Sequence, residues 1–138
     1  MRWGFIVDIT RCKRKRITQK VRGIAIQVAS SLPLVGPIEE TPSFKASIIF
    51  FQSSKRWRKE DAETPRGDRG DLDNMVKDVF DGLGPIIGFR TSWNQVDGEW
   101  VPSPSTKPAD SRILELFAKK VNSGSLSEMV SVEIETLT

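Results

Sequence analysis

The stretch RGDLDNMVKDVFDGL (Arg69–Leu83) carries aspartates at positions 71, 73, 78 and 81 and one lysine at position 77. Placed on a helix at about 100° per residue, its apolar side chains recur at i, i+3, i+4, i+7, i+8 and i+11 from Leu72 and form one continuous face. This spacing predicts an amphipathic helix over residues 72–83. Asp71 stands immediately before the first apolar position, where an N-cap residue belongs.

The polar side of this helix gathers charge. Asp73, Lys77 and Asp81 form an i, i+4, i+8 stripe, and Asp78 is expected to be a solvated charge close to them. Partial positive charge at the helix N-terminus favours the carboxylates of Asp71 and Asp73. One interpretation is an ordinary N-cap with an exposed i, i+4 ion pair. The other is a divalent-cation site, because hard oxygen ligands suit Mg²⁺. Spacing alone leaves both open.

Outward from this helix, the chain reads as a mixed α/β domain with one sheet and two helices. A first helix is predicted over residues 17–31, where apolar residues recur at helical spacing. Gly82 and Gly84 are expected to end the second helix. Strands are predicted at Trp3–Ile9, Lys45–Phe51, 84–89, 112–121 and 130–134, the one at 112–121 being mostly buried and the last half-exposed.

Two segments are predicted to lie outside this framework. Residues 52–70 have almost no apolar content and are expected to form a mobile basic loop. Residues 85–109 are rich in turn formers and are expected to form a surface excursion that Trp93 or Trp100 holds by packing.

Composition narrows the possible chemistry. The 138 residues are enough for one domain, and Cys12 is the single cysteine, so an internal disulfide and a cysteine-based zinc site are excluded. The absence of histidine and tyrosine excludes His-based triads, His-ligated zinc and covalent phosphotyrosine chemistry. No segment is long and apolar enough to span a membrane, and we expect a cytoplasmic protein.

Charge is unevenly distributed along the chain. Residues 1–60 contain 13 Lys/Arg and 4 Asp/Glu, a net charge of +9, whereas residues 61–138 contain 8 Lys/Arg and 14 Asp/Glu, a net charge of −6. Such asymmetry suggests a polyanionic partner held by one part while carboxylates act in another. Folding that interleaves the two halves would erase the asymmetry, so charge alone does not settle the partner.

Two sequence elements, in order, resemble the signature of the RusA family of Holliday junction resolvases. Gly70–Lys77 (GDLDNMVK) and Asp81–Leu83 (DGL) match its D-[LI]-D-N-x-x-K-x-x-x-D-x-L helix, and Asp110–Leu116 (DSRILEL) matches its D-S-x-I-x-x-L element. The chain departs from the family where Pro85–Ala109 replaces a short connection. It departs again where Ala109 stands in place of the first aspartate of a frequent pair.

The resemblance implies a single RusA-like α+β domain over residues 1–138, acting as a homodimeric, metal-dependent endodeoxyribonuclease. Family members cut four-way DNA junctions by paired symmetric nicks, in DNA recombination and repair. Asp71, Asp73 and Asp110 match the family's metal-binding catalytic carboxylates, with Mg²⁺ as cofactor and Mn²⁺ as a substitute. Lys77 matches its catalytic lysine. An association with the nucleoid follows, and a cellular or viral origin stays open.

Basic side chains elsewhere are the expected phosphate contacts. Trp57 lies among them and could stack on an exposed base, or it could anchor the loop by packing. The alternative function is a non-catalytic DNA- or RNA-binding protein whose aspartates only cap and solvate a helix. The expected DNA-binding residues are Arg14, Arg16, Lys20, Lys55, Arg56, Trp57, Arg58, Lys59, Arg66 and Arg69.

Overall fold

A four-stranded mixed sheet forms the framework of the protein in the computed structural model, which describes residues 1–29, 42–56 and 71–137. The strand order is β1-β6-β2-β5, with β2 and β5 parallel and the other neighbours antiparallel. The predicted mixed α/β architecture is therefore confirmed. The strands are β1 (Arg2–Asp8), β2 (Ser43–Gln52), β5 (Ile113–Asn122) and β6 (Met129–Leu137).

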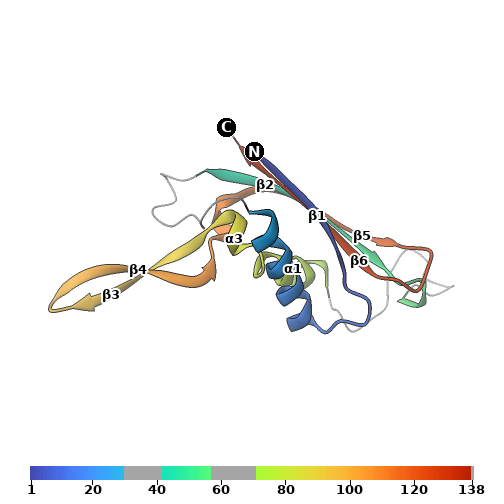
Figure 1. Ribbon diagram of the computed structural model, residues 1–138, viewed down its shortest axis with the longest axis horizontal. Coiled ribbons are helices and arrows are strands. Elements are labelled where there is room, and N and C mark those ends of the chain that lie inside the picture. Colours follow the sequence, from blue (N-terminus) through green and yellow to red (C-terminus); the bar gives the residue numbers. More distant parts are fainter. Residues whose placement is uncertain (30–41, 57–70, 138) are drawn as a thin grey trace.

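Three helices pack on one face of this sheet, and the described residues leave its other face open (Figure 1). Alternation along β2 and β6 sends every second side chain toward the helices, as strand geometry requires. Phe44, Ile48 and Val132 on that face are almost completely buried. The helices are α1 (Arg14–Val28), α2 (Leu72–Phe80) and the short α3 (Gly84–Ile87).

The contact between α1 and α2 is unusually close at Gly82. A Cβ atom at that position would lie 2.8 Å from both the Thr18 carbonyl oxygen and Val21 Cγ1. Gly84 is similarly confined, because a Cβ there would meet the ring of Phe89. Gly82 and Gly84 were expected only as helix terminators, whereas close packing is what requires a residue without a side chain at both positions.

Residues 84–109 contain the main departure from the predicted elements. The strand predicted at 84–89 is wrong, because residues Gly84–Ile87 form α3 with proline in its first turn, a position that proline favours. The excursion is a hairpin of β3 (Phe89–Val96) and β4 (Glu99–Pro108) that projects from the domain (Figure 1). Trp93 and Trp100 are 57% and 66% exposed, so the predicted packing role of these tryptophans is wrong.

Strand β5 also differs from expectation. It is present almost at its predicted bounds, but it lies at the edge of the sheet instead of being mostly buried. Leu114 is 65% exposed and Phe117 is 52% exposed. Apolar residues on both faces of a strand are typical of an interior strand. β2 is nevertheless the only neighbour of β5 among the described strands.

Candidate active site on helix α2

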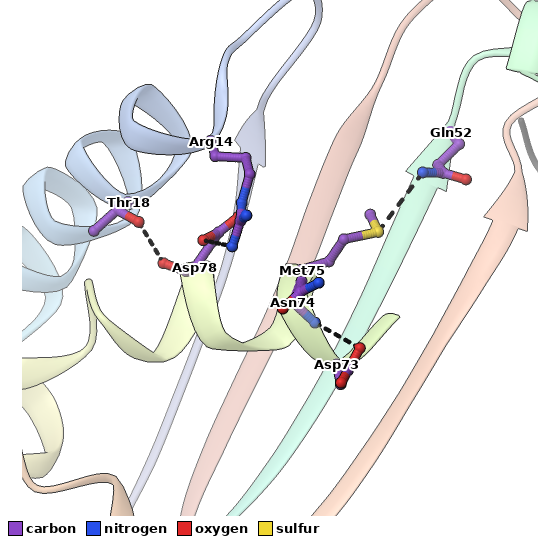
Figure 2. A network of polar contacts seen from close by, with 7 residues as sticks. All are labelled: Arg14, Thr18, Gln52, Asp73, Asn74, Met75 and Asp78. Carbon is purple, nitrogen blue, oxygen red and sulfur yellow. Dashed lines mark hydrogen bonds and ion pairs between the residues drawn. The ribbon is translucent and has the colours of Figure 1, made fainter. Parts of the chain in front are cut away.

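The first turn of α2 presents two carboxylates. Asp71 is the N-cap residue, with φ −75° and ψ 160°, but its side chain makes no capping hydrogen bond. Asp73 is in the first turn, and its Oδ1 accepts a 3.0 Å hydrogen bond from the Asn74 backbone N–H (Figure 2). Both residues are exposed. Most of the lone pairs of these two carboxylates therefore remain available to a ligand.

Lys77 lies one turn further along the same helix and is exposed. The spacing from Asp73 to Lys77 allows an i, i+4 ion pair, but no such pair is present among the ion pairs of the described residues. Within residues 1–29, 42–56 and 71–137, no carboxylate forms an ion pair with the Lys77 ammonium group. The simple interpretation of this stripe as a helix-stabilising ion pair loses its geometric support.

Asp78, on the same helix, behaves differently from its predicted role as a solvated charge, and that prediction is wrong. Asp78 is 8% exposed, and its carboxylate accepts hydrogen bonds from Arg14 Nε at 2.9 Å and Arg14 Nη2 at 3.2 Å. This two-point bond to Asp78 raises the pKa of Arg14. Thr18 Oγ1 also donates to the Asp78 backbone carbonyl at 2.7 Å (Figure 2). Asp78 thus joins α2 to α1.

On the sheet side, α2 is held by its apolar face. Met75, Val76 and Val79 are buried in the core. Gln52 Nε2, at the end of β2, donates to Met75 Sδ at 3.8 Å (Figure 2). With Asp78 bound to α1 and this face bound to the sheet, the rotation of α2 about its own axis is determined. The exposed side that results carries Asp73 and Lys77, and the exposed Asp71 stands at the N-cap.

Asp110, the third predicted carboxylate, lies in the 3₁₀ turn η3 (Asp110–Arg112) immediately before β5. Its Oδ1 forms an ion pair with Arg90 Nη2 at 2.7 Å, and both side chains are partly exposed. The turn is anchored by Arg112, a buried residue whose Nη1 donates to the Ile87 carbonyl at 2.8 Å. Burial lowers the pKa of Arg112.

The structure does not gather the three predicted metal ligands. Within residues 1–29, 42–56 and 71–137, no group of three or more Cys, Asp or Glu side chains is arranged to hold a metal ion. Ile113, at the start of β5, pairs with Phe44 at the start of β2, whereas Met75 of α2 contacts Gln52 at the end of β2. Asp110 and the first turn of α2 thus approach the sheet near opposite ends of β2. Convergence of Asp110 with Asp71 and Asp73 stays a prediction.

The structure describes only some of the basic residues predicted to bind DNA. Arg14 is occupied by Asp78 although half of its side chain is exposed, and Lys20 Nζ donates to the Asp8 carbonyl at 2.9 Å. Arg16 and Lys55 are exposed. Phosphate contacts by these residues stay predictions. The backbone of Arg56 ends the 3₁₀ turn η2 (Ser54–Arg56), while its side chain and the five remaining candidates lie outside the described residues: Trp57, Arg58, Lys59, Arg66 and Arg69.

The Arg14–Asp78 pair is the contact of this region that the sequence interpretation missed. A signal for it was present, since Asp78 and Asp81 place negative charge near the C-terminal end of α2, where the helix dipole disfavours it. Such a carboxylate needs a cation. Arg14 supplies one to the Asp78 carboxylate, whereas Arg22 Nη2 donates at 3.1 Å to the backbone carbonyl of Asp81.

No family model matches the chain, and no curated protein matches it. Among the helices that the structure describes, none has the length and apolar character needed to cross a membrane.

Proposed function

We propose that this protein is a metal-dependent endodeoxyribonuclease of the RusA type, which resolves four-way DNA junctions by paired nicks in a homodimer. The observation that carries the proposal is that different residues of the α2 region make its packing contacts and provide its exposed charged side chains. Its apolar face and Asp78 are used in packing, while the N-cap residue Asp71, Asp73 in the first turn and Lys77 in the last turn stay exposed. The proposed setting is DNA recombination and repair in the cytoplasm, at the nucleoid.

The donor chemistry at the start of α2 fits a divalent metal. Asp71 and Asp73 offer adjacent exposed carboxylates, and Mg²⁺ or Mn²⁺ is bound through such oxygens. When bound, the ion would supply an activated water and polarise the scissile phosphate. Asp110 is the proposed third ligand. Joining the other two carboxylates requires it to leave Arg90 and to move from the start of β2 toward the end of β2 at which α2 begins.

Lys77 would provide positive charge for the phosphoryl group in the reaction. Phosphodiester hydrolysis builds negative charge on the phosphoryl oxygens, and a positioned ammonium group offsets that charge. Because neither Asp73 nor another described carboxylate pairs with it, the Lys77 ammonium is available to phosphate. The basic residues of the first half of the chain, Arg16 and Lys55 among them, would hold the backbone of the junction arms.

The experiment is cleavage of a synthetic four-way junction with and without Mg²⁺ or Mn²⁺. The purified protein should nick two opposed strands only when the metal is added. Asp73→Asn should abolish nicking while junction binding, followed by gel mobility shift, survives, because the amide is nearly isosteric but a poorer metal ligand. Glu135→Gln is the matched control, since it removes one exposed carboxylate charge from strand β6 and should cut normally.

The alternative is a non-catalytic DNA- or RNA-binding protein. It is favoured by one observation, the ion pair between Arg90 and Asp110 together with the lack of a three-ligand group in the described part of the chain. A junction that is bound tightly but stays intact with either metal would support this alternative and contradict the nuclease. Normal cleavage by Asp73→Asn would contradict the assignment of the site residues.

A further inference from the structure

Two adjacent lysines of β5 lie on opposite faces of the sheet. The pairing of β2 with β5 is continuous over residues 45–52 of β2, and it places Lys120 beside Phe50. Phe50 is almost completely buried in the core beneath the helices, so Lys120 belongs to the helix-covered face. Lys119 belongs to the open face, where it is exposed and its ammonium group lies 5.8 Å from the centroid of the Phe117 ring.

Lys120 lies at the end of the sheet where α2 begins. Its neighbour Phe50 is two residues before Gln52, whose Nε2 donates to Sδ of Met75 in α2 at 3.8 Å. Helix α2 packs against β5, whereas α1 packs against β1, at the other end of the strand order. Lys120 is partly buried, and a lysine in such a position packs its apolar stem against its neighbours and keeps its ammonium group at the surface.

The candidate residues Asp73 and Lys77 lie on the side of α2 that faces away from α1. Asp78 marks the side that faces α1, because its carboxylate binds Arg14 of that helix. At about 100° per residue, Lys77 lies about 100° from Asp78 around the helix axis and Asp73 lies about 140° from it. Figure 2 shows Asp73 and Asp78 on different sides of α2. Because β5 is on the side of α2 away from α1, Lys120 and Asp73 share this side.

We propose that Lys120 binds a backbone phosphate of DNA beside the start of α2, so that the DNA passes along the side of α2 that carries Asp73 and Lys77. Carboxylates alone would repel a phosphodiester, so a strand brought to them needs cations nearby. Lys77 provides one from the helix and Lys120 another from the sheet. A lysine ammonium group has three donors, so a phosphate oxygen can share it with an acceptor of the protein. The inference rests on the proposed function, because it takes DNA as the ligand of this site.

The test is the salt dependence of junction binding, measured by fluorescence anisotropy without divalent metal so that no strand is cut. Lys120→Met keeps the unbranched apolar stem and removes the charge. The plot of the logarithm of the binding constant against the logarithm of salt concentration should become shallower by about 0.9 for each protomer on the DNA. Lys120→Arg keeps the charge and should retain the wild-type slope.

Lys119→Met is the matched control. It makes the same change one residue away, on the open face of the sheet, and should leave the slope unchanged. A wild-type slope for Lys120→Met, or an equal fall for Lys119→Met, would overturn the inference. If Lys120→Met does not keep the wild-type urea midpoint, Lys120→Gln repeats the test with a polar side chain and the same expected slope.

The result can be separated from that of the nuclease proposal. A wild type that binds junctions but cuts none with Mg²⁺ contradicts the nuclease, and a shallower Lys120→Met slope would still support the phosphate contact. Normal cutting together with an unchanged Lys120→Met slope would retain the nuclease and remove Lys120 from the DNA contacts. A wild type that binds no junction DNA would overturn both.

Discussion

The contact between α1 and α2 makes a sharp prediction about two glycines. Gly82→Ala should destabilise the protein, whereas Gly23→Ala should stabilise it. Neither glycine has a positive φ, so backbone strain does not separate them, and the surroundings of the new methyl group decide the outcome. A Cβ at residue 82 would meet the Thr18 carbonyl oxygen at 2.8 Å, while nothing lies within 4 Å of a Cβ at residue 23.

The magnitude follows from how far the helices must move. Ordinary contact begins at 3.4 Å, so α1 and α2 would have to separate by about 0.6 Å at Gly82. Relief by a side chain is excluded at Thr18, because the blocking atom belongs to the backbone of α1, and Val21 is completely buried. Overpacking of this kind costs about 1–3 kcal/mol. Gly23 is an exposed position inside α1, where alanine in place of glycine adds about 1 kcal/mol of helix stability.

Urea unfolding followed by far-UV circular dichroism measures both changes. The midpoint should fall for Gly82→Ala and rise for Gly23→Ala, with the slope of free energy against urea unchanged in each. From the usual unfolding entropy of about 2.1 cal/mol/K per residue, 1–3 kcal/mol corresponds to a fall in Tm of roughly 3–10 °C. A Gly82→Ala protein as stable as the wild type would show that α1 and α2 do not pack as described.

Three further changes test the site and its supports. Lys77→Ala should lower single-turnover junction cleavage by roughly 10²-fold while binding in a mobility shift is retained; an unchanged rate would remove Lys77 from the chemistry. Asp78→Asn should lower the urea midpoint because it removes the charge that holds Arg14 across two helices, and a midpoint equal to wild type would restore the view of Asp78 as a solvated charge. Replacing residues 93–102 by Asn-Gly joins Ser92 to its ladder partner Ser103. This shortening should change the unfolding free energy by less than about 0.5 kcal/mol, as for other surface changes, and should shift the preference between four-way and linear DNA. Loss of folded protein would show that the hairpin supports the core.

Periodicity predicted the parts of the fold that bury one face. The apolar face of α2 and the alternation along β6 both follow from the spacing of their side chains, and the structure confirms both. Two local signals would have corrected the middle of the chain. Pro85 is placed for the first turn of a helix. The pair Asp97-Gly98, with φ of 50° and 81°, has the sequence and conformation of the tight turn that most favours a two-residue hairpin.

The prediction for β5 failed for a different reason. The spacing of apolar residues indicates that a strand is buried, but it does not show which neighbouring element buries it. Leu114, Leu116 and Phe117 read as buried because their pattern is that of an interior strand. In the single chain they are exposed at an edge.

In the candidate site, too, the sequence predicts positions within one helix but not the position of a residue far along the chain. Helical geometry determines that Asp73 and Lys77 lie on one side of α2, because residues four apart share a face, and Asp71 stands just before the helix as its N-cap. The position of Asp110 depends on everything between the two motif elements, namely α3, the hairpin and the turn that Arg112 anchors. No residue spacing specifies that path. Since Arg90 comes from the base of that hairpin and holds the Asp110 carboxylate, the segment absent from the usual family pattern is also the one that occupies the third proposed ligand. A nuclease built on these residues would need both the release of Asp110 from Arg90 and a rearrangement that brings Asp110 to the start of α2, because the two lie near opposite ends of β2.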